Sequence, residues 1–129
     1  MIFLFGPLYN GKRAAAAAIL HCEMDELSRR AIWDVQELAA RTVNLNMSAG
    51  DPDITASRAA DKLDALAEKL SRYEVVIATE IGGGVVPMDA GERAAREAAG
   101  RLNCLLAERA TAVIRVFCGI PLLIKGELP

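Results

Sequence analysis

The hydrophobic positions of this chain form short continuous runs, separated by long stretches in which apolar residues recur every three or four positions. A short continuous run is typical of a strand buried in a sheet, whereas the longer spacing is that of a helix with one buried face. Strands joined by helices are expected to run parallel, so the pattern indicates an α/β layer fold. The runs predict three strands: Ile2–Phe5, Val75–Thr79 and Ala112–Cys118.

Two of the predicted helices have clear start signals. Asp51 suits an N-cap and is followed by a proline, so a helix is predicted over residues 52–70. Asp89 suits a second N-cap with Glu92 as its reciprocal capping partner, so another helix is predicted over residues 90–109. These signals place one helical crossover before the strand at Val75 and one after it.

The stretch from Lys12 to Arg41 leaves alternatives open. It contains neither proline nor glycine, and its apolar residues recur at helical spacing, which predicts one long amphipathic helix or two helices with a break around residues 21–25. The competing interpretation is a strand at Ala31–Asp34, which would place the Asp34 carboxylate at a strand end, where it could hold Mg²⁺. We favour the helix, in which Asp34 lies on a solvated face.

Composition narrows the class of protein. With 129 residues and 53% hydrophobic content, the chain is expected to form one domain, residues 1–129. A net charge of −2 and 5% aromatic residues argue against a nucleic-acid partner, and no membrane span is expected, because polar residues interrupt the apolar amino-terminal segment. Cys22, Cys104 and Cys118 lack metal-binding spacing, so a reduced, cytoplasmic setting is expected, with Cys104 and Cys118 in the core.

A glycine-containing loop follows the first predicted strand. Its sequence fits G-x-x-x-x-G-K, in which backbone N–H groups, the lysine and the start of the next helix together hold phosphate. Arg13 stands where a Ser or Thr hydroxyl would bind Mg²⁺, so the usual metal ligand is replaced. The alternative is an ordinary glycine turn leading into a helix. The candidate nucleotide-binding residues are Gly6, Asn10, Gly11, Lys12 and Arg13.

A second glycine-rich segment follows the strand Val75–Thr79. Glu80 stands at the end of this strand, directly before a run that includes Gly82 and Gly84. A carboxylate at a strand end beside glycines is typical of a loop that faces a ligand, and the alternative is a capping or solvated acid. This segment therefore supplies a second set of candidate site residues.

The helix predicted after this segment carries a polar stripe. Arg96, Gly100 and Asn103 fall on one line along the helix, beside its apolar face. A glycine within such a stripe indicates that something packs closely there. A ligand or subunit contact is the functional interpretation, and a solvated helix surface is the alternative.

Together, these residues resemble a known family, the bifunctional adenosylcobinamide kinase and adenosylcobinamide-phosphate guanylyltransferase of cobalamin biosynthesis. The resemblance departs from the family pattern at Thr79, Glu97 and Thr111, where the family usually has Asn, Asp and Asp. It covers roughly a third of the chain, which supports common descent more firmly than common activity. It runs from Glu80 to Gly119 through E-x-G-x-G-x-V-P, Arg96-Glu97, Gly100-Arg101, Asn103 and Leu106-Ala107.

The resemblance implies phosphoryl transfer from GTP or ATP to the hydroxyl of adenosylcobinamide, with a corrinoid as the second small-molecule substrate. The family's guanylylated histidine has no evident counterpart, since the single histidine, His21, lies in a segment predicted to be helical. The alternative is a non-catalytic nucleotide-binding or scaffold relative of the family. The roles implied by the resemblance are catalysis for Lys12 and Glu80, with Glu80 as metal or hydroxyl partner, and ligand contacts for Gly82, Gly84, Arg96 and Asn103.

The predicted fold class is α/β: a reduced P-loop-type three-layer fold with a small, mainly parallel sheet and a long helix after the phosphate loop. Compared with the resembled family, the chain is shortened between the phosphate loop and Leu45. If the strands that usually flank one side of the first strand are absent, Ile2–Phe5 becomes an apolar edge strand, which invites pairing with another chain. The segment between Lys12 and Arg41 would also keep apolar residues exposed, and members of the resembled family form trimers. We therefore expect a homo-oligomer whose interface includes that segment.

Overall fold

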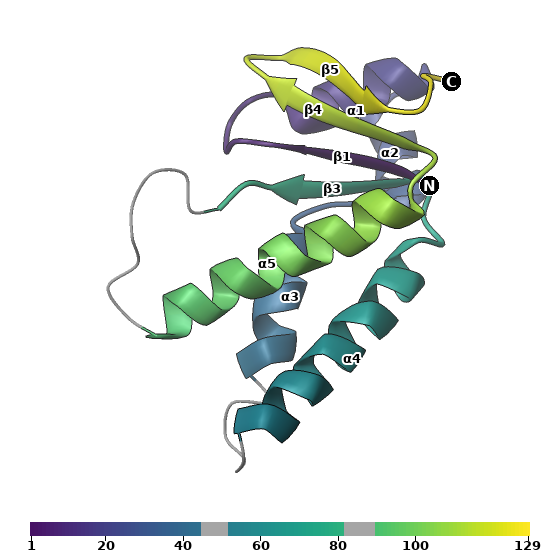
Figure 1. Ribbon diagram of the computed structural model, residues 1–129. Coiled ribbons are helices and arrows are strands. Elements are labelled where there is room, and N and C mark those ends of the chain that lie inside the picture. Colours follow the sequence, from purple (N-terminus) through teal and green to yellow (C-terminus); the bar gives the residue numbers. More distant parts are fainter. Residues whose placement is uncertain (45–51, 82–89) are drawn as a thin grey trace.

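The computed structural model describes residues 1–44, 52–81 and 90–129 (Figure 1). The predictions for Asp51, Gly82, Gly84 and Asp89 lie outside the described residues. The predicted α/β class is confirmed. In chain order the elements are β1 Ile2–Gly6, α1 Lys12–Leu20, α2 Met24–Arg30, β2 Ala31–Ile32, α3 Val35–Asn44, α4 Pro52–Leu70, β3 Val75–Thr79, α5 Ala90–Arg109, β4 Ala112–Phe117 and β5 Ile120–Lys125.

The described strands form one sheet in the order β2-β3-β1-β4-β5. The first four strands in this order run parallel, and β5 returns antiparallel to β4. The register sets Phe5 of β1 opposite Ala78 of β3 and Arg115 of β4, so the carboxyl ends of these strands share one edge of the sheet. In open α/β sheets, ligands bind at this edge, between two neighbouring strands that lead into helices on opposite faces of the sheet. This place is called the switch point.

Helices cover both faces of the sheet, which gives the three layers seen in Figure 1. On one face, Ala16 of α1 and Leu27 of α2 pack with Leu4 and Ile77 of the strands. On the other face, α3, α4 and α5 pack on Phe3 and neighbouring strand residues. Because successive strand residues point to opposite faces, β1 and β3 contribute side chains to both clusters. Strands β1 and β3 therefore lie at the centre of the fold.

The stretch 12–41 is two short helices, a two-residue strand and a further helix, so the prediction of one long helix is wrong. His21 ends α1 in the left-handed conformation, with φ of 52°, at the break allowed for by the two-helix alternative. Leu27 and Val35 are both fully buried, but in clusters on opposite faces of the sheet. One straight helix cannot reach both faces, and β2 carries the chain from one to the other.

Strand β1 is central rather than at the edge, which corrects the prediction for Ile2–Phe5. The difference arises from the strand order, because β3 pairs with one side of β1 and β4 with the other. Strands β2 and β5 then extend the sheet beyond these two neighbours. Strand β5 follows a two-residue turn in which Cys118 and Gly119 both have positive φ, 52° and 76°. Such a turn suits the twist of a hairpin and explains the glycine at this position.

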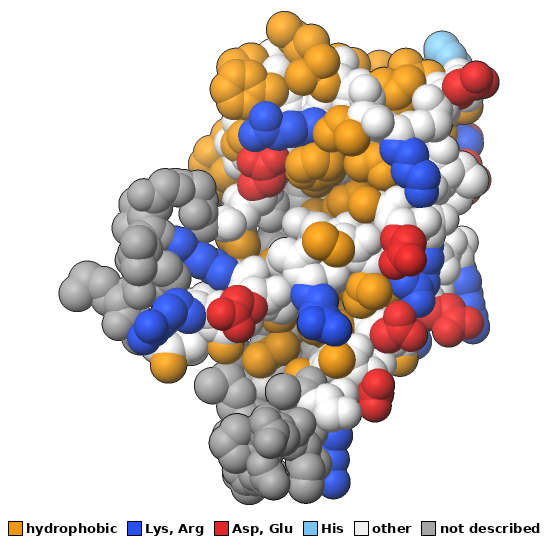
Figure 2. Space-filling view, in the orientation of Figure 1, with side chains coloured by type: hydrophobic (Ala, Val, Ile, Leu, Met, Phe, Trp, Pro, Cys, Tyr) orange, Lys and Arg blue, Asp and Glu red, His pale blue; other side chains and the backbone are white. Residues whose placement is uncertain are grey.

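The largest group of exposed apolar side chains lies on the β4–β5 hairpin, whereas the helices after the loop expose Met24 of α2. Figure 2 shows hydrophobic side chains gathered at the end of the molecule that carries this hairpin. Lys125 at the end of β5 donates hydrogen bonds to the carbonyls of Ala107 and Glu108, 3.0 and 3.1 Å away, and so caps α5. The large exposed apolar residues of the hairpin are Phe117, Ile120, Leu122, Leu123 and Ile124.

The cysteines and the character of the helices bear on two further predictions. Cys104 and Cys118 are exposed, which corrects their predicted burial; Cys104 lies on the outer side of α5 and Cys118 in the hairpin turn. Among the helices of the described residues, none combines the length and apolar character that crossing a membrane requires.

Candidate functional site

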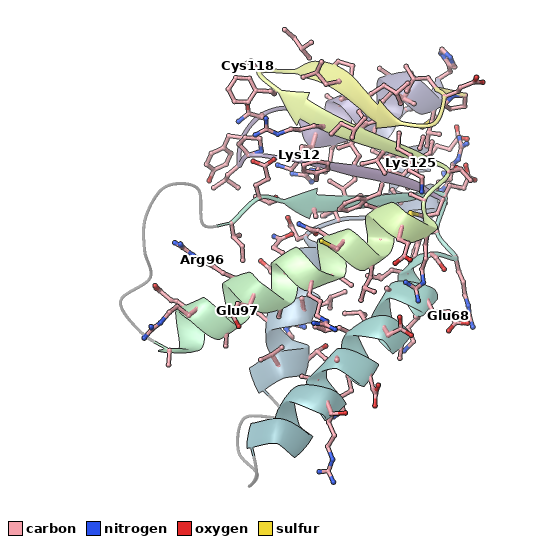
Figure 3. The ribbon with its side chains drawn as sticks, in the orientation of Figure 1. Lys12, Glu68, Arg96, Glu97, Cys118 and Lys125 are labelled. Atoms are coloured by element: carbon pink, nitrogen blue, oxygen red, sulfur yellow. The ribbon has the colours of Figure 1, made fainter. Side chains whose placement is uncertain are left out.

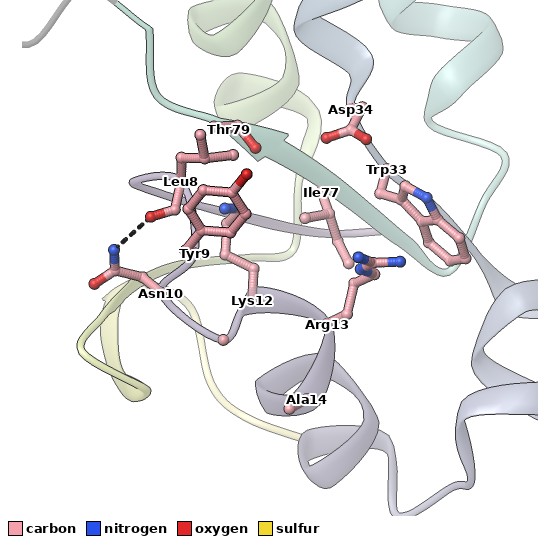
Figure 4. Close-up of a pocket in the computed structure, with 11 residues that line it drawn as sticks. Leu8, Tyr9, Asn10, Lys12, Arg13, Ala14, Trp33, Asp34, Ile77 and Thr79 are labelled. Carbon is pink, nitrogen blue, oxygen red and sulfur yellow. Dashed lines mark hydrogen bonds between the residues drawn. The ribbon is translucent and has the colours of Figure 1, made fainter.

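A cavity of about 220 Å³ opens at the carboxyl ends of β1 and β3 (Figure 4). One wall is the loop between β1 and α1 with the first turn of α1, and the other is formed by the ends of β2 and β3. The cavity therefore lies at the switch point of the sheet, where a ligand is expected. Its described lining residues are Leu8, Tyr9, Asn10, Gly11, Lys12, Arg13, Ala14, Trp33, Asp34, Ile77 and Thr79.

The loop takes its shape from its two glycines. Gly6 ends β1 so close to β4 that an added Cβ would lie 2.2 Å from the carbonyl oxygen of Val116. Gly11 has φ of 76° at the N-cap position of α1 and offers no side chain to the helix. The first N–H groups of a helix have no partner within it, so the start of α1 is left uncapped at the cavity wall. Uncapped N–H groups and the helix dipole favour an anion at this point.

Asn10 joins this loop to the β4–β5 hairpin. Its side-chain oxygen accepts a hydrogen bond from the Cys118 N–H at 2.7 Å, and its backbone oxygen accepts one from Gly119 at 2.9 Å. Its side-chain amide donates to the carbonyl of Leu8 at 2.9 Å (Figure 4). The amide predicted to bind the nucleotide is thus engaged within the protein, and its contribution to the site is to position the loop.

Replacing Asn10 by alanine is expected to loosen the loop. Asn10→Ala removes two side-chain hydrogen bonds, for a loss of about 1–2 kcal/mol in the free energy of unfolding. Urea denaturation measures this loss. Asn103→Ala is a comparison, because the Oδ1 of Asn103 is buried and has no hydrogen-bond partner within the described structure. A smaller loss for Asn10→Ala than for Asn103→Ala would contradict the role assigned to Asn10.

Lys12 places a buried ammonium group in the loop, where it could contact a bound anion. The residue is 9% exposed, and its Nζ donates to the carbonyl of Pro7 at 2.7 Å. The pKa of Lys12 is lowered from its usual value, and burial is the largest cause. The positive charge of Arg13 also lowers this pKa, whereas the negative charges of Asp34 and Glu80 partly offset the change. A phosphate at the start of α1 would offset the loss of hydration that lowers this pKa.

Arg13 and Asp34 face the cavity from opposite walls. The Arg13 guanidinium lies 5.2 Å from the centre of the Trp33 ring, a cation–π contact that holds the side chain along the wall. Asp34 follows β2 with φ of 57° and is exposed. The strand interpretation of this segment, which we disfavoured, is therefore the better one for residues 31–32, and it brings Asp34 to the site.

Glu80 lies at the end of β3 as predicted, but its carboxylate is already paired. The Arg115 Nε and a terminal nitrogen donate to the two carboxylate oxygens at 2.8 and 3.1 Å. This two-point contact raises the pKa of Arg115. The backbone N–H of Glu80 donates to Gly6 at 2.8 Å, which continues the β1–β3 pairing. The contact with Arg115 therefore already occupies an acceptor site on each oxygen of the Glu80 carboxylate.

Three contributors to the site escaped sequence reasoning. Arg115 was hidden in an apolar strand, although a charged residue within such a run is itself a signal. Gln36 is buried, and its side-chain oxygen accepts a hydrogen bond from the backbone N–H of Thr79 at 2.9 Å. Thr79 ends β3, beyond the part of β3 that pairs with β2. Trp33 forms the wall on which Arg13 rests. All three act through contacts between segments far apart in the sequence.

The predicted stripe on α5 lies outside the described cavity lining. Figure 3 shows Arg96 extending from the first half of α5, which covers the face of the sheet opposite α1. An added Cβ at Gly100 meets nothing within 4 Å, so among the described residues nothing packs closely against this glycine. The structure brings Asn10, Gly11, Lys12 and Arg13 together, with Gly6 and Glu80 beside them, and leaves Arg96 and Asn103 apart.

The described residues do not fit a Mg²⁺ site. Mg²⁺ requires several oxygen ligands, and in a P-loop one is the hydroxyl replaced here by Arg13. Asp34 is the one carboxylate among the described lining residues, and Glu80 is paired with Arg115. The described part of the chain also holds no group of three or more His, Cys, Asp or Glu residues able to bind a metal ion.

Comparison with known proteins assigns the chain to a family. The family model described as "Cobinamide kinase / cobinamide phosphate guanyltransferase" matches residues 25–124, well over half of the chain. No curated protein matches the sequence. The matched region includes β2, β3, α5, β4 and all of β5 except its last residue. It begins after the loop at Gly6–Arg13, whose candidate role therefore rests on the geometry of the loop.

Proposed function

Because this chain belongs to the cobinamide kinase / cobinamide phosphate guanyltransferase family, we propose that it transfers a phosphoryl group from GTP or ATP to the hydroxyl of adenosylcobinamide. The family places the protein in cobalamin biosynthesis, with nucleotide and corrinoid as its substrates. One observation supports the nucleotide site above all: the uncapped start of α1 lies beside the buried Lys12 at the switch point of the sheet.

In this proposal the charged residues that line the cavity have separate tasks. The N–H groups at the start of α1 and the Lys12 ammonium hold the phosphate chain, and Arg13 neutralises part of its charge. The hydroxyl oxygen of the acceptor attacks the terminal phosphorus of the nucleotide. The bond from that phosphorus to the leaving nucleoside diphosphate breaks, and the hydroxyl proton passes to a carboxylate. Asp34 is suited to accept this proton because it lines the cavity, whereas Glu80 is held by Arg115.

The size of the cavity limits what it can hold. At about 220 Å³ it is smaller than the roughly 300–1,000 Å³ usual for small-molecule sites. It can take a phosphate chain, and the corrinoid would lie outside its mouth. Leu8 and Tyr9 at the loop tip are 59% and 94% exposed and offer apolar contact there. This arrangement leaves the acceptor hydroxyl to approach the phosphates from the open side.

A kinase assay tests the proposal. Purified protein is incubated with adenosylcobinamide and either GTP or ATP, and phosphorylated corrinoid is measured by chromatography. We expect product from wild type and none above background from Asp34→Asn. Glu37→Gln serves as the matched control, since Glu37 is a nearby exposed acid on α3 that does not line the cavity. Absence of product from wild type, with nucleotide binding retained, would favour the second candidate.

The second candidate is a nucleotide-binding relative without catalysis. It is favoured by the poor fit to Mg²⁺, since phosphoryl transferases of the P-loop type rely on a metal between the phosphates. Both candidates share the nucleotide site and differ only in turnover. Nucleotide binding alone therefore does not distinguish them, whereas the kinase assay does.

No guanylylated enzyme is expected to form. His21 ends α1, and the proposed phosphate site is at the start of that helix, nine residues and therefore about 13 Å away. Incubation with labelled GTP, followed by analysis of acid-labile label, should recover none on the protein. Label on His21 would contradict this prediction and would restore the guanylyltransferase half of the family's activity.

Self-association stays part of the proposal, although its predicted basis has changed. The helix residues invoked for it include Leu27 and Val35, which are fully buried, so the exposed hairpin is now the better candidate for an interface. We predict a homo-oligomer in light scattering, and Leu122→Glu on β5 should shift it toward monomer. A monodisperse wild-type monomer would contradict this.

A cytoplasmic setting also stays a prediction, in keeping with the three free cysteines.

A further inference from the structure

The position after the loop lysine is the most unusual feature of the site. A P-loop places a small hydroxyl there to hold the metal, whereas this chain has Arg13. The structure gives that arginine a definite place: its guanidinium rests on Trp33 at 5.2 Å and the residue lines the cavity beside Lys12. A guanidinium held in this way is a fixed positive charge with several N–H donors at the phosphate site.

A second departure concerns the carboxylate at the end of β3. Arg115 contacts both oxygens of Glu80, and the same guanidinium lies 5.6 Å from the centre of the Phe117 ring. The pair is therefore held from two sides and removes one negative charge from the edge of the cavity. Among the described residues, this pairing lowers the negative charge near the phosphates and supplies no free ligand set for a divalent cation.

These two departures act in the same direction. A polyphosphate chain carries several negative charges, which a metal ion commonly balances. In this site the balancing charges are Lys12 and Arg13, with the N–H groups at the start of α1. Guanidinium and ammonium groups form strong charge-assisted hydrogen bonds with phosphate oxygens. Bound Mg²⁺ would instead be repelled by two cations and would find Asp34 as its one carboxylate on the described cavity wall.

We infer that the cavity binds its polyphosphate as the metal-free anion, with Arg13 in the place of the divalent cation. This inference rests on the nucleotide site of the proposed function. It applies to either candidate function. Binding of the anion requires no turnover, and in a kinase the same arginine can stabilise charge on the transferring phosphoryl group. It also predicts that free tripolyphosphate binds, since the charges that hold the ligand all face the phosphates.

The test is calorimetric titration of the full chain with tripolyphosphate, GTP and ATP, each in excess EDTA and in excess Mg²⁺. We expect binding in EDTA that is as tight as in Mg²⁺ or tighter. Arg13→Gln keeps a long side chain against Trp33 but removes the charge, so it should weaken binding in EDTA by about tenfold or more. Arg72→Ala, an exposed arginine at the opposite end of the sheet, is the matched control and should change nothing.

The possible outcomes separate the inference from the proposed function. Binding that requires Mg²⁺ would overturn the inference and leave the nucleotide site in place. Binding in EDTA that survives Arg13→Gln unchanged, in a variant with wild-type thermal stability, would also overturn it. If no phosphate compound binds under either condition, the proposed nucleotide site fails and the inference fails with it.

Discussion

Lys12→Ala is expected to weaken the binding of GTP or ATP by roughly ten- to hundredfold, the loss typical of one charge-assisted contact with phosphate. Lys12 is the buried cation of the loop, and its Nζ already lies 2.7 Å from the loop carbonyl of Pro7. A ligand phosphate would take over that position. Calorimetric titration of wild type and variant measures the change directly.

The matched control for this prediction is Lys69→Ala. Lys69 is exposed in the last turn of α4 and does not line the cavity, so its removal should leave nucleotide affinity unchanged. Equal affinity in wild type and Lys12→Ala would show that the loop is only a turn.

Gly6→Ala is expected to destabilise the fold by about 2 kcal/mol or more, because the added Cβ would lie 2.2 Å from the backbone carbonyl of Val116. The contact involves main chain on both sides, so relief requires β1 and β4 to move apart at the site. Those are central strands of the sheet, and they carry the loop and Arg115. Chemical denaturation measures the loss in free energy of unfolding.

Gly100→Ala provides the internal control, since it makes the same chemical change in the middle of α5. Nothing lies within 4 Å of an added Cβ there, and alanine is a better helix former than glycine. We expect a gain of roughly 0.5–1 kcal/mol. A loss at Gly100 would indicate a close contact there, and a neutral Gly6→Ala would contradict the tight packing of the loop's first residue.

The elements that sequence analysis predicted well are those specified by local signals. Strand β3 was predicted with its observed bounds, and α5 with both ends, because an apolar run and a helical repeat identify them without reference to the rest of the chain. The loop residues Gly11, Lys12 and Arg13 were predicted by their spacing after a strand. The structure brings these three together at one cavity.

The features that escaped prediction depend on tertiary contacts. Strand β2 has two residues and gains its structure by pairing with Val75 and Val76 of β3, so its sequence alone could equally be helical. Strand β5 contains Pro121, which argues against a central strand but is tolerated at an edge. The sequence allowed a strand at Ala31–Asp34 but the helix was favoured, so Asp34 was expected on a solvated helix face and not at a strand end.

The pairing of Glu80 with Arg115 shows the same limit at the site itself. The two residues are 35 positions apart and meet because β3 and β4 flank β1 in register. Family resemblance singled out Glu80 as a catalytic carboxylate, and that role stays a prediction. Its partner is set by the order of the strands in the sheet and could be found only once that order was known.

The most direct test of the account is an NMR titration of isotope-labelled protein with GTP and with ATP. Uniform labelling reports on every backbone amide, and Trp33 is the single tryptophan, so its indole N–H is an unambiguous probe of the cavity. We predict saturable shifts of the Gly11, Lys12 and Arg13 amides and of the Trp33 indole with either nucleotide. Spectra unchanged at these positions at about millimolar nucleotide, or shifts confined to other parts of the protein, would contradict a phosphate site between β1 and β3.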